Sequence, residues 1–87
     1  MEVRHRMGKF YAKTRHGEAE LRYDMDDDVM RIYHTFVPKE DRMKGVAGRL
    51  TKAAFAFARN NNMKVDPNCE YVLHFVEKNK GYRKDCV

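Results

Sequence analysis

A segment near the middle of the chain combines small residues with bases in a way that suits a bound anion. It reads Arg42, Met43, Lys44, Gly45, Val46, Ala47 and Gly48. The small residues let an anion come close to their backbone amides. If a helix begins here, its first N–H groups lack intrahelical partners and its dipole adds partial positive charge. The segment therefore indicates a phosphate site, with Arg42 and Lys44 adding ionic contacts at its rim. The alternative is an ordinary helix start with solvated bases around it.

Two side chains further along suggest nucleophile and acid chemistry. Cys69 lies at the expected start of a second helix, where the dipole favours the thiolate and so raises its reactivity. The alternative is a small, buried packing residue. Tyr71 follows two residues later and has a hydroxyl that can donate a proton. Its alternative role is to pack against Phe75, four residues on in the same helix.

Two further residues are candidate bases that could remove a proton from a reacting group. His34 lies in a β-rich segment, where alternation places it on one strand face with Ile32 and Phe36. It is therefore either a base or a half-buried histidine without a chemical role. Glu40 follows this segment, and its alternative is an ordinary loop carboxylate.

The elements that must position these residues begin with strands. Residues 9–13 are rich in aromatic side chains, and a turn signal at 14–17 closes a hairpin. Apolar and charged residues alternate from 19 to 25, which predicts a half-buried strand with period two. Residues 29–37 are apolar at odd and even positions, which predicts a central strand covered on both faces, and Pro38 ends it.

The second half of the chain predicts helix, strand and helix. Apolar residues recur at spacings of three and four between 45 and 61, which predicts an amphipathic helix. They are Val46, Leu50, Ala53, Ala54, Phe57 and Ala58. A short strand at 63–65 follows, and Asn68 is placed to cap a helix over 69–79. A strand, a crossover helix and a strand in this order make the last two strands parallel.

Length and composition limit the classes of protein. The 87 residues make one domain, 1–87, and 43% hydrophobic residues indicate a globular chain. No apolar run is long enough for a membrane span, the N-terminus lacks the apolar stretch of a signal peptide, and two cysteines suit a reducing cytosol. A cytoplasmic location is expected. Net charge is 18 − 13 = +5, and residues 42–64 contain bases without a single acid, so an anionic partner is expected there.

Three short motifs occupy related places in the chain. Residues 34–38 read His-Thr-Phe-Val-Pro, Arg42 with Gly45 and Ala47 forms R-x-x-G-x-A, and residues 67–71 read Pro-Asn-Cys-Glu-Tyr. With these motifs the chain resembles the small single-domain branch of the GNAT superfamily of acetyl-CoA-dependent N-acetyltransferases, over nearly its whole length. The resemblance implies a minimal GNAT-like fold of the α+β (mixed α/β) class. Its sheet would be mainly antiparallel, with a parallel strand pair beside the main helix and the order ββββαβα.

The resemblance also implies acetyl-CoA as the co-substrate, without a metal, and an amine as the acceptor. The pantetheine arm would lie along the edge of the central strand near Phe36 and Val37, where a backbone N–H polarises the thioester carbonyl. Backbone amides from 43 to 48 would hold the diphosphate. Contacts from the second helix would come from Phe75, Lys78 and Asn79. For Lys78 the alternative is a lysine favoured at a helix end by the dipole alone.

In this resemblance Cys69 carries the acetyl group transiently or protonates the leaving thiolate, with Tyr71 as the alternative acid and His34 as a base. Two departures matter. Met43 stands where the family loop often has glycine, and no helical segment precedes the strand at residue 9, where larger members have two helices that wall the acceptor site. A protein partner that completes the acceptor site is therefore one expectation.

Three other interpretations remain. A small basic nucleic-acid-binding domain fits the charge, but no RNP-type aromatic motif is present and the strands precede the helices. A zinc domain is disfavoured because the histidines and cysteines lack paired short spacings. The third is a GNAT-fold module that binds acyl-CoA without turnover.

Overall fold

Five strands form one sheet in the order in which they occur along the chain. The computed structural model describes all residues, 1–87. The strands are β1 (Arg4–Arg6), β2 (Lys9–Thr14), β3 (Gly17–Asp26), β4 (Val29–Phe36) and β5 (Lys64–Pro67). Neighbouring strands from β1 to β4 pair antiparallel, and β4 pairs with β5 in parallel. The predicted mixed sheet with one parallel pair is therefore confirmed.

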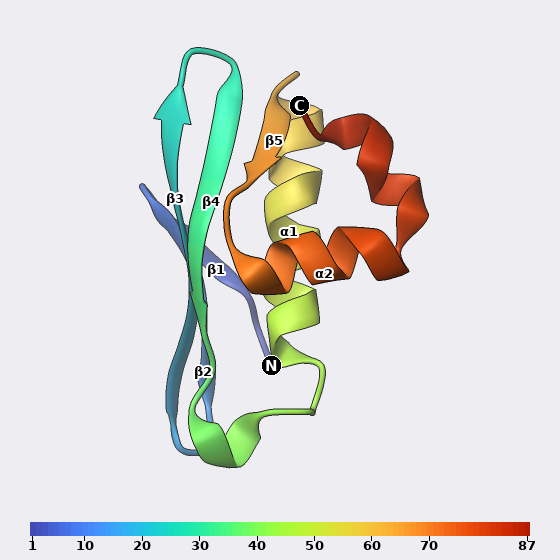
Figure 1. Ribbon diagram of the computed structural model, residues 1–87. Helices are drawn as coiled ribbons and strands as arrows, with labels where there is room; N and C mark the ends of the chain where they lie inside the picture. Colours follow the sequence, from blue (N-terminus) through green and yellow to red (C-terminus); the bar gives the residue numbers. More distant parts are fainter.

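The helices lie on one face of this sheet (Figure 1). The long helix α1 (Val46–Asn60) connects β4 to β5, and α2 (Glu70–Lys78) follows β5. Two short 3-10 helices complete the chain, η1 (Lys39–Asp41) before α1 and η2 (Lys80–Asp85) after α2. The predicted order ββββαβα and the α+β class are confirmed, and η2 is an addition that the sequence patterns do not reveal.

The sequence patterns do not predict the first strand, because all its residues are charged or polar and exposed. Arg4 pairs with Tyr11 and Arg6 with Lys9, so β1 is held by the ladder of β2. The ring of His5 stacks on Phe10, with 4.0 Å between centroids, and its Nε2 lies 2.5 Å from the Tyr23 hydroxyl. His5 remains largely exposed, but the part of its ring that is removed from water lowers its pKa. Cross-strand contacts, rather than any alternation of its own, therefore position β1.

The prediction that β4 is covered on both faces is wrong. Met30 and Ile32 are buried under the helices, whereas Arg31 and Tyr33 face the side of the sheet that no helix covers (Figure 1). An antiparallel neighbour allows one wet face, and the Arg31 guanidinium forms a salt bridge with Asp24 on β3 there. The outer face of β4 is therefore only partly buried and carries a cross-strand ion pair.

A β-bulge changes the direction of side chains halfway along β4. Tyr23 pairs with Ile32 and Arg22 with His34, so Tyr33 is one extra residue in the strand. Beyond the bulge Thr35 pairs with the inward Leu21. The predicted alternation that joins His34 to Ile32 on one face is therefore wrong, because the extra residue places His34 on the outer face.

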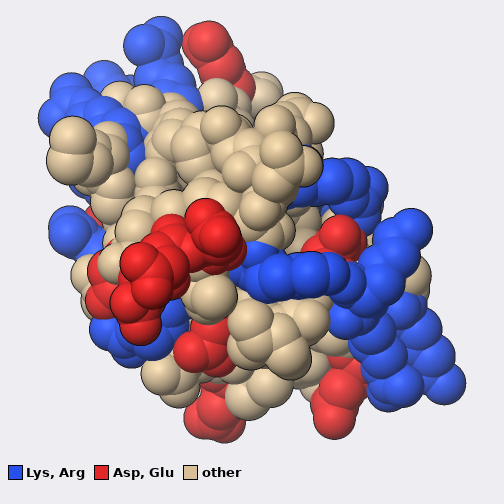
Figure 2. Space-filling view, turned by 90° about the horizontal axis from the view of Figure 1, so that it is seen from above, with Lys and Arg blue, Asp and Glu red and all other residues tan.

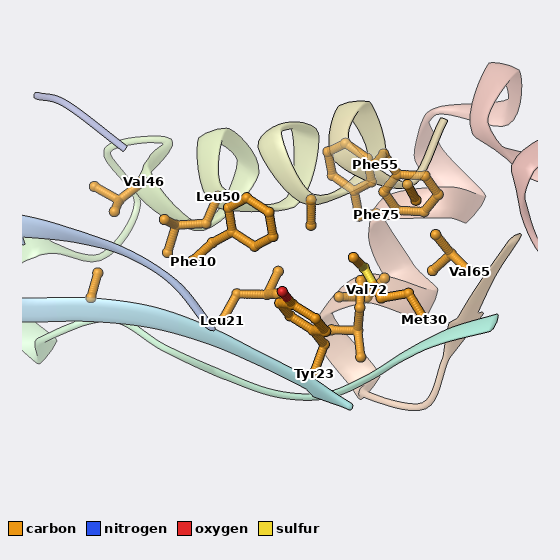
Figure 3. Packing of buried hydrophobic residues seen from close by; sticks show 14 of the residues in the cluster. Phe10, Leu21, Tyr23, Met30, Val46, Leu50, Phe55, Val65, Val72 and Phe75 are labelled. Atoms are coloured by element: carbon orange, nitrogen blue, oxygen red, sulfur yellow. The ribbon is translucent and has the colours of Figure 1, made fainter. Parts of the chain in front are cut away.

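The core lies between the sheet and the two helices (Figure 3). Helix α1 buries Val46, Leu50, Ala54 and Ala58 as predicted, and it also buries Thr51 and Phe55. The Thr51 hydroxyl is satisfied by donating to the Ala47 carbonyl at 2.8 Å. The ring of Phe55 meets Tyr82 of η2 edge-on at 5.0 Å between centroids, so η2 closes the end of the core.

The prediction that Asn68 caps the second helix is wrong. Helix α2 begins at Glu70 with Cys69 as its N-cap residue, and no side chain accepts a capping hydrogen bond. The Asn68 backbone N–H donates instead to the Ile32 carbonyl at 2.9 Å. Asn68 thus belongs to the end of the β4–β5 pairing, and the helix begins one residue later.

Phe55 is the largest fully buried side chain of the core. Its side chain is fully buried between sheet, α2 and η2. We expect Phe55→Ala to lower the free energy of unfolding by about 3–5 kcal/mol, because it removes a large apolar side chain and leaves a cavity. Urea unfolding followed by circular dichroism measures the change. The exposed neighbour Ala56→Ser is the control, and equal stability of both variants would contradict this account of the core.

Candidate functional site

The predicted phosphate segment lies where the sheet passes into α1. Gly45 is the N-cap residue of α1 with φ of +80°, and its carbonyl accepts the Arg49 N–H at 3.1 Å. Met43 also has a positive φ, +66°, which is uncommon for a residue with a side chain. Its side chain is fully exposed. The backbone therefore turns sharply into the helix, and the first amides of α1 have no carbonyl to bond within the helix.

A cavity of about 370 Å³ opens beside this turn. Its lining residues are Thr35, Phe36, Val37, Asp41, Arg42, Met43, Gly45, Val46, Ala47, Gly48 and Tyr71. The structure thus brings together the segment predicted to bind phosphate, the end of β4 and one candidate acid. Most of the lining comes from the single stretch 35–48.

The end of β4 presents a free edge to this cavity. Pairing with β5 stops at Ile32 and Pro67, and its last hydrogen bond runs from the Asn68 N–H to the Ile32 carbonyl at 2.9 Å. Beyond Ile32 the strand therefore has a neighbour on the β3 side only. The resemblance implies such a splayed edge beside Phe36 and Val37.

Arg42 and Lys44 are held by the protein itself. The Arg42 Nε donates to the Val37 carbonyl at 2.9 Å, and its guanidinium lies 6.0 Å from the centre of the Phe36 ring. Lys44 Nζ lies 3.7 Å from Asp41 Oδ1 and does not line the cavity. Arg42 is thus fixed at the wall, whereas Lys44 balances a carboxylate nearby.

Asp41 anchors the loop to the hairpin between β2 and β3. Its carboxylate is buried and accepts hydrogen bonds from the Thr14 hydroxyl at 2.8 Å and the His16 backbone N–H at 2.9 Å. The His16 ring Nδ1 lies 3.1 Å from the other oxygen. Burial alone would raise the pKa of Asp41, but the hydrogen bonds from His16 and Thr14 outweigh it and lower the pKa to about 2. The carboxylate is therefore ionised at neutral pH.

Tyr71 projects from α2 to the start of α1. A Cβ built on Gly48 would lie 3.5 Å from the Tyr71 hydroxyl, so the hydroxyl stands next to the first turn of α1. Burial raises the pKa of Tyr71, which keeps its proton in place at neutral pH. The Tyr71 ring also lies 6.4 Å from the Phe75 ring, as its packing alternative predicts. The packing contact with Phe75 thus leaves the hydroxyl beside the start of α1.

Cys69 lies behind the cavity wall. Its Sγ is 3.5 Å from the Thr35 Oγ1, and either atom can donate. Thr35 lines the cavity but Cys69 does not. The sulfur thus does not enter the cavity, but it contacts the Thr35 hydroxyl of a residue that lines it.

The candidate bases lie away from the cavity. His34 is on the outer face of the sheet, with Nε2 3.4 Å from Glu20 Oε2. The hydrogen bond from Arg22, helped by the charges of Arg22, Lys9 and His34, outweighs burial and lowers the pKa of Glu20. Glu40 is an exposed residue of η1. Neither His34 nor Glu40 lines the cavity.

A second hollow adjoins the first. It shares Gly45, Gly48 and Tyr71 with the first cavity and is also lined by Arg49, Lys52, His74, Phe75, Lys78 and Asn79. The three predicted cofactor contacts, Phe75 and Lys78 of α2 and its C-cap residue Asn79, thus lie together here.

Sequence reasoning missed several of these lining residues. Thr35 was hidden because the bulge reverses the alternation of β4, and Asp41 has no local pattern that marks its contact with the distant hairpin. Arg49 and Lys52 lie outside the segment 42–48 that predicts the phosphate site, although both line the second hollow. Their shared spacing of three residues was the available signal.

The acidic turn between β3 and β4 lies at the opposite end of α1 from the site (Figure 1). Seen from that end of the molecule, the largest group of acidic side chains forms a patch, smaller acidic groups lie elsewhere on this face, and lysine and arginine side chains form groups of their own (Figure 2). Neither helix α1 nor α2 has the length and hydropathy that a membrane-crossing helix needs. No three side chains of His, Cys, Asp or Glu gather where they could hold a metal ion.

Fold and site together define a GNAT-like domain: a crossover helix begins with a glycine turn where a parallel strand pair separates. A family model described as GCN5-related N-acetyltransferase matches residues 9–86, and the chain belongs to this family. The NMR solution structure of a GCN5-like protein from Staphylococcus aureus is similar, with a TM-score of 0.81, 31% identity and coverage of 99% of this chain and 87% of that one.

Two curated relatives are similar over a shorter range. Protein NATD1 of Bos taurus and of Gallus gallus are each 32% identical over 65 residues, which is 74% of this chain. The match spans 58% and 59% of the length of these relatives.

The Asp41 anchor has a consequence for stability against pH. The ordinary pKa of the group is 3.8 and the folded pKa is about 2, so its contribution is fully present above pH 3.8 and is lost as the pH falls through about 2. We expect the free energy of unfolding to fall over this range. In Asp41→Asn this part of the pH dependence should vanish, with lower stability at pH 7. Urea titrations at several pH values measure it, with the exposed Asp27→Asn as control, and parallel pH profiles of wild type and Asp41→Asn would contradict the anchor.

Proposed function

We propose that this protein transfers an acetyl group from acetyl-CoA to an amine. The observation that carries the proposal is the cavity that joins the unpaired first amides of α1 to the free edge of β4. The family membership supports it, since GCN5-related N-acetyltransferases are the class whose model matches the chain.

The residues present fit a bound acetyl-CoA. Gly45 has nothing within 4 Å of an added Cβ, and Gly48 would meet only the Tyr71 hydroxyl, so the backbone there is open to a diphosphate. The apolar side chains of Phe36, Val37 and Val46 line the cavity beside it and suit a pantetheine arm. The amides of residues 43–48 would hold the diphosphate, and a backbone N–H near Phe36 would point at the thioester carbonyl.

Acetyl-CoA supplies an acyl group activated as a thioester. The chain orients it and exchanges protons. The free edge of β4 fixes the acyl group against an incoming amine, which alone accelerates attack because the reacting atoms no longer have to find one another. Tyr71 is the best-placed acid, because its hydroxyl is protonated at neutral pH and lines the cavity.

In this proposal Cys69 acts indirectly, by bonding to the Thr35 hydroxyl, which lines the cavity. Its sulfur bonds to the Thr35 hydroxyl and does not line the cavity, so a covalent acetyl-cysteine needs a movement that Tyr71 does not. His34 lies on the outer face and does not line the cavity, so this proposal gives it no part in proton transfer there.

A second candidate function is binding of acyl-CoA without turnover. The cavity contains one carboxylate, Asp41, and its hydrogen bonds to Thr14 and His16 already occupy it. No other acidic or histidine side chain lines the cavity to take the proton of an ammonium group. Turnover then depends on an amine that reaches the site already deprotonated, or on a group supplied by the acceptor or a partner protein.

Calorimetric titration with acetyl-CoA tests the site, with Gly48→Ala as the informative variant. Gly48 has a helical backbone, so alanine should preserve or raise stability by about 0.5–1 kcal/mol. The added methyl narrows the approach beside Tyr71, and we expect affinity to fall about tenfold, a loss of about 1.4 kcal/mol. Gly81→Ala, in open space on η2, is the control. Unchanged affinity in a folded Gly48→Ala variant would move the site elsewhere.

Tyr71→Phe separates enzyme from binder. We expect it to lower kcat by about 100-fold while leaving the acetyl-CoA Kd within about twofold, because it removes only the proton donor. Tyr82→Phe removes the same atom outside the cavity and is the matched control. Cys69→Ala should retain more activity than Tyr71→Phe. Acetylated Cys69 in a mass spectrum after mixing with acetyl-CoA would overturn this assignment, and binding without turnover of any tested amine would favour the second candidate.

A further inference from the structure

The second hollow has a charge pattern of its own. It measures about 350 Å³ and continues from the first cavity past the wall shared at Gly45, Gly48 and Tyr71. Two bases come from α1 and one from the last turn of α2: Arg49, Lys52 and Lys78. Arg49 and Lys52 are three residues apart and so lie on the same helix face. No aspartate or glutamate lines the hollow.

These three bases lack the acidic partners that other bases of the protein have. Arg22, Arg31 and Arg59 form salt bridges with Glu20, Asp24 and Asp85. Arg49, Lys52 and Lys78 form none, and Arg49 donates only to the Met1 carbonyl at 3.2 Å. Three cations that converge from two helices repel one another unless an anion lies between them. The hollow is therefore suited to a group with more than one negative charge.

The position of the hollow indicates which anion it takes. Coenzyme A consists of a pantetheine arm, a diphosphate and an adenosine that carries a 3′-phosphate. With the arm at the β4 edge and the diphosphate at the amides of 45–48, the adenosine end must leave the first cavity on its other side. The second hollow begins there, at the same glycines. The 3′-phosphate is a dianion near neutral pH, and lysine and arginine bind such groups well.

We propose that Arg49, Lys52 and Lys78 bind the 3′-phosphate of coenzyme A, and that the protein thereby selects coenzyme A over acyl carriers that lack this group. The inference rests on the proposed function, because it takes the diphosphate to lie at the start of α1. It adds a source of specificity: the arm and diphosphate are common to coenzyme A and dephospho-coenzyme A, and only the second hollow distinguishes them.

Calorimetric titrations with coenzyme A and with dephospho-coenzyme A test the proposal on the full chain. At low salt the wild type should bind coenzyme A about 10–30-fold more tightly, a preference that weakens as salt rises. In the double variant Arg49→Ala with Lys52→Ala, coenzyme A affinity should fall to near that of dephospho-coenzyme A, whose own affinity should change about twofold or less. Lys78→Ala should give a partial loss.

The matched control removes the same charge elsewhere. Arg4→Ala with Lys13→Ala changes two exposed bases on the first two strands and should preserve the preference for coenzyme A. Circular dichroism confirms that both double variants fold. Equal affinity of the wild type for the two ligands overturns the inference while leaving the proposed function in place. Failure to bind either ligand overturns both, and binding of a single-stranded oligonucleotide instead would assign the bases to nucleic acid.

Discussion

The site depends on one interruption of backbone pairing, the end of the parallel ladder at Ile32 and Pro67. The last bond of this ladder is the one that the Asn68 N–H donates to the Ile32 carbonyl, and the chain then enters α2. The bulge at Tyr33 adds a bend directly after this point. Together they free the end of β4 on one side and turn Thr35 inward. Without this separation the start of α1 would face a closed sheet, and no cavity would join its amides to a strand edge.

A second constraint keeps the turn into α1 in shape. Met43 and Gly45 both have positive φ. This backbone conformation is unfavourable, particularly for a residue with a Cβ, so a loop keeps it only when other contacts hold the loop in place. Asp41 supports it from one side by bonding to the β2–β3 hairpin, and Arg42 supports it from the other by donating to Val37. The hairpin turn and the loop are far apart in sequence. Because of their contact, the conformation of the loop depends on the position of the hairpin in the sheet.

Most of the architecture could be predicted from the sequence, because hydrophobic period and turn residues act locally. The long helix, the parallel strand pair and the segment 42–48 follow from such patterns. What could not be predicted arises from contacts distant in sequence. The bulge changes the face of His34 with no signal in composition, β1 has no alternation to detect, and Asn68 bonds to β4 instead of capping a helix. The partner of Asp41 is likewise invisible to local patterns.

The single helical layer of the domain explains why most residues of the site come from one continuous stretch of the chain. With one helical layer, only the inner face of the sheet is buried (Figure 1), and the outer face carries cross-strand charge pairs such as Lys9 with Glu18 and Arg31 with Asp24. No additional element is present to wall a pocket. The cavity is therefore lined by the stretch 35–48, where the backbone passes from strand to helix, and by Tyr71 from the next helix. Beside this stretch, the exposed faces of α1 and α2 carry the unpaired bases Arg49, Lys52 and Lys78, which line the adjoining hollow.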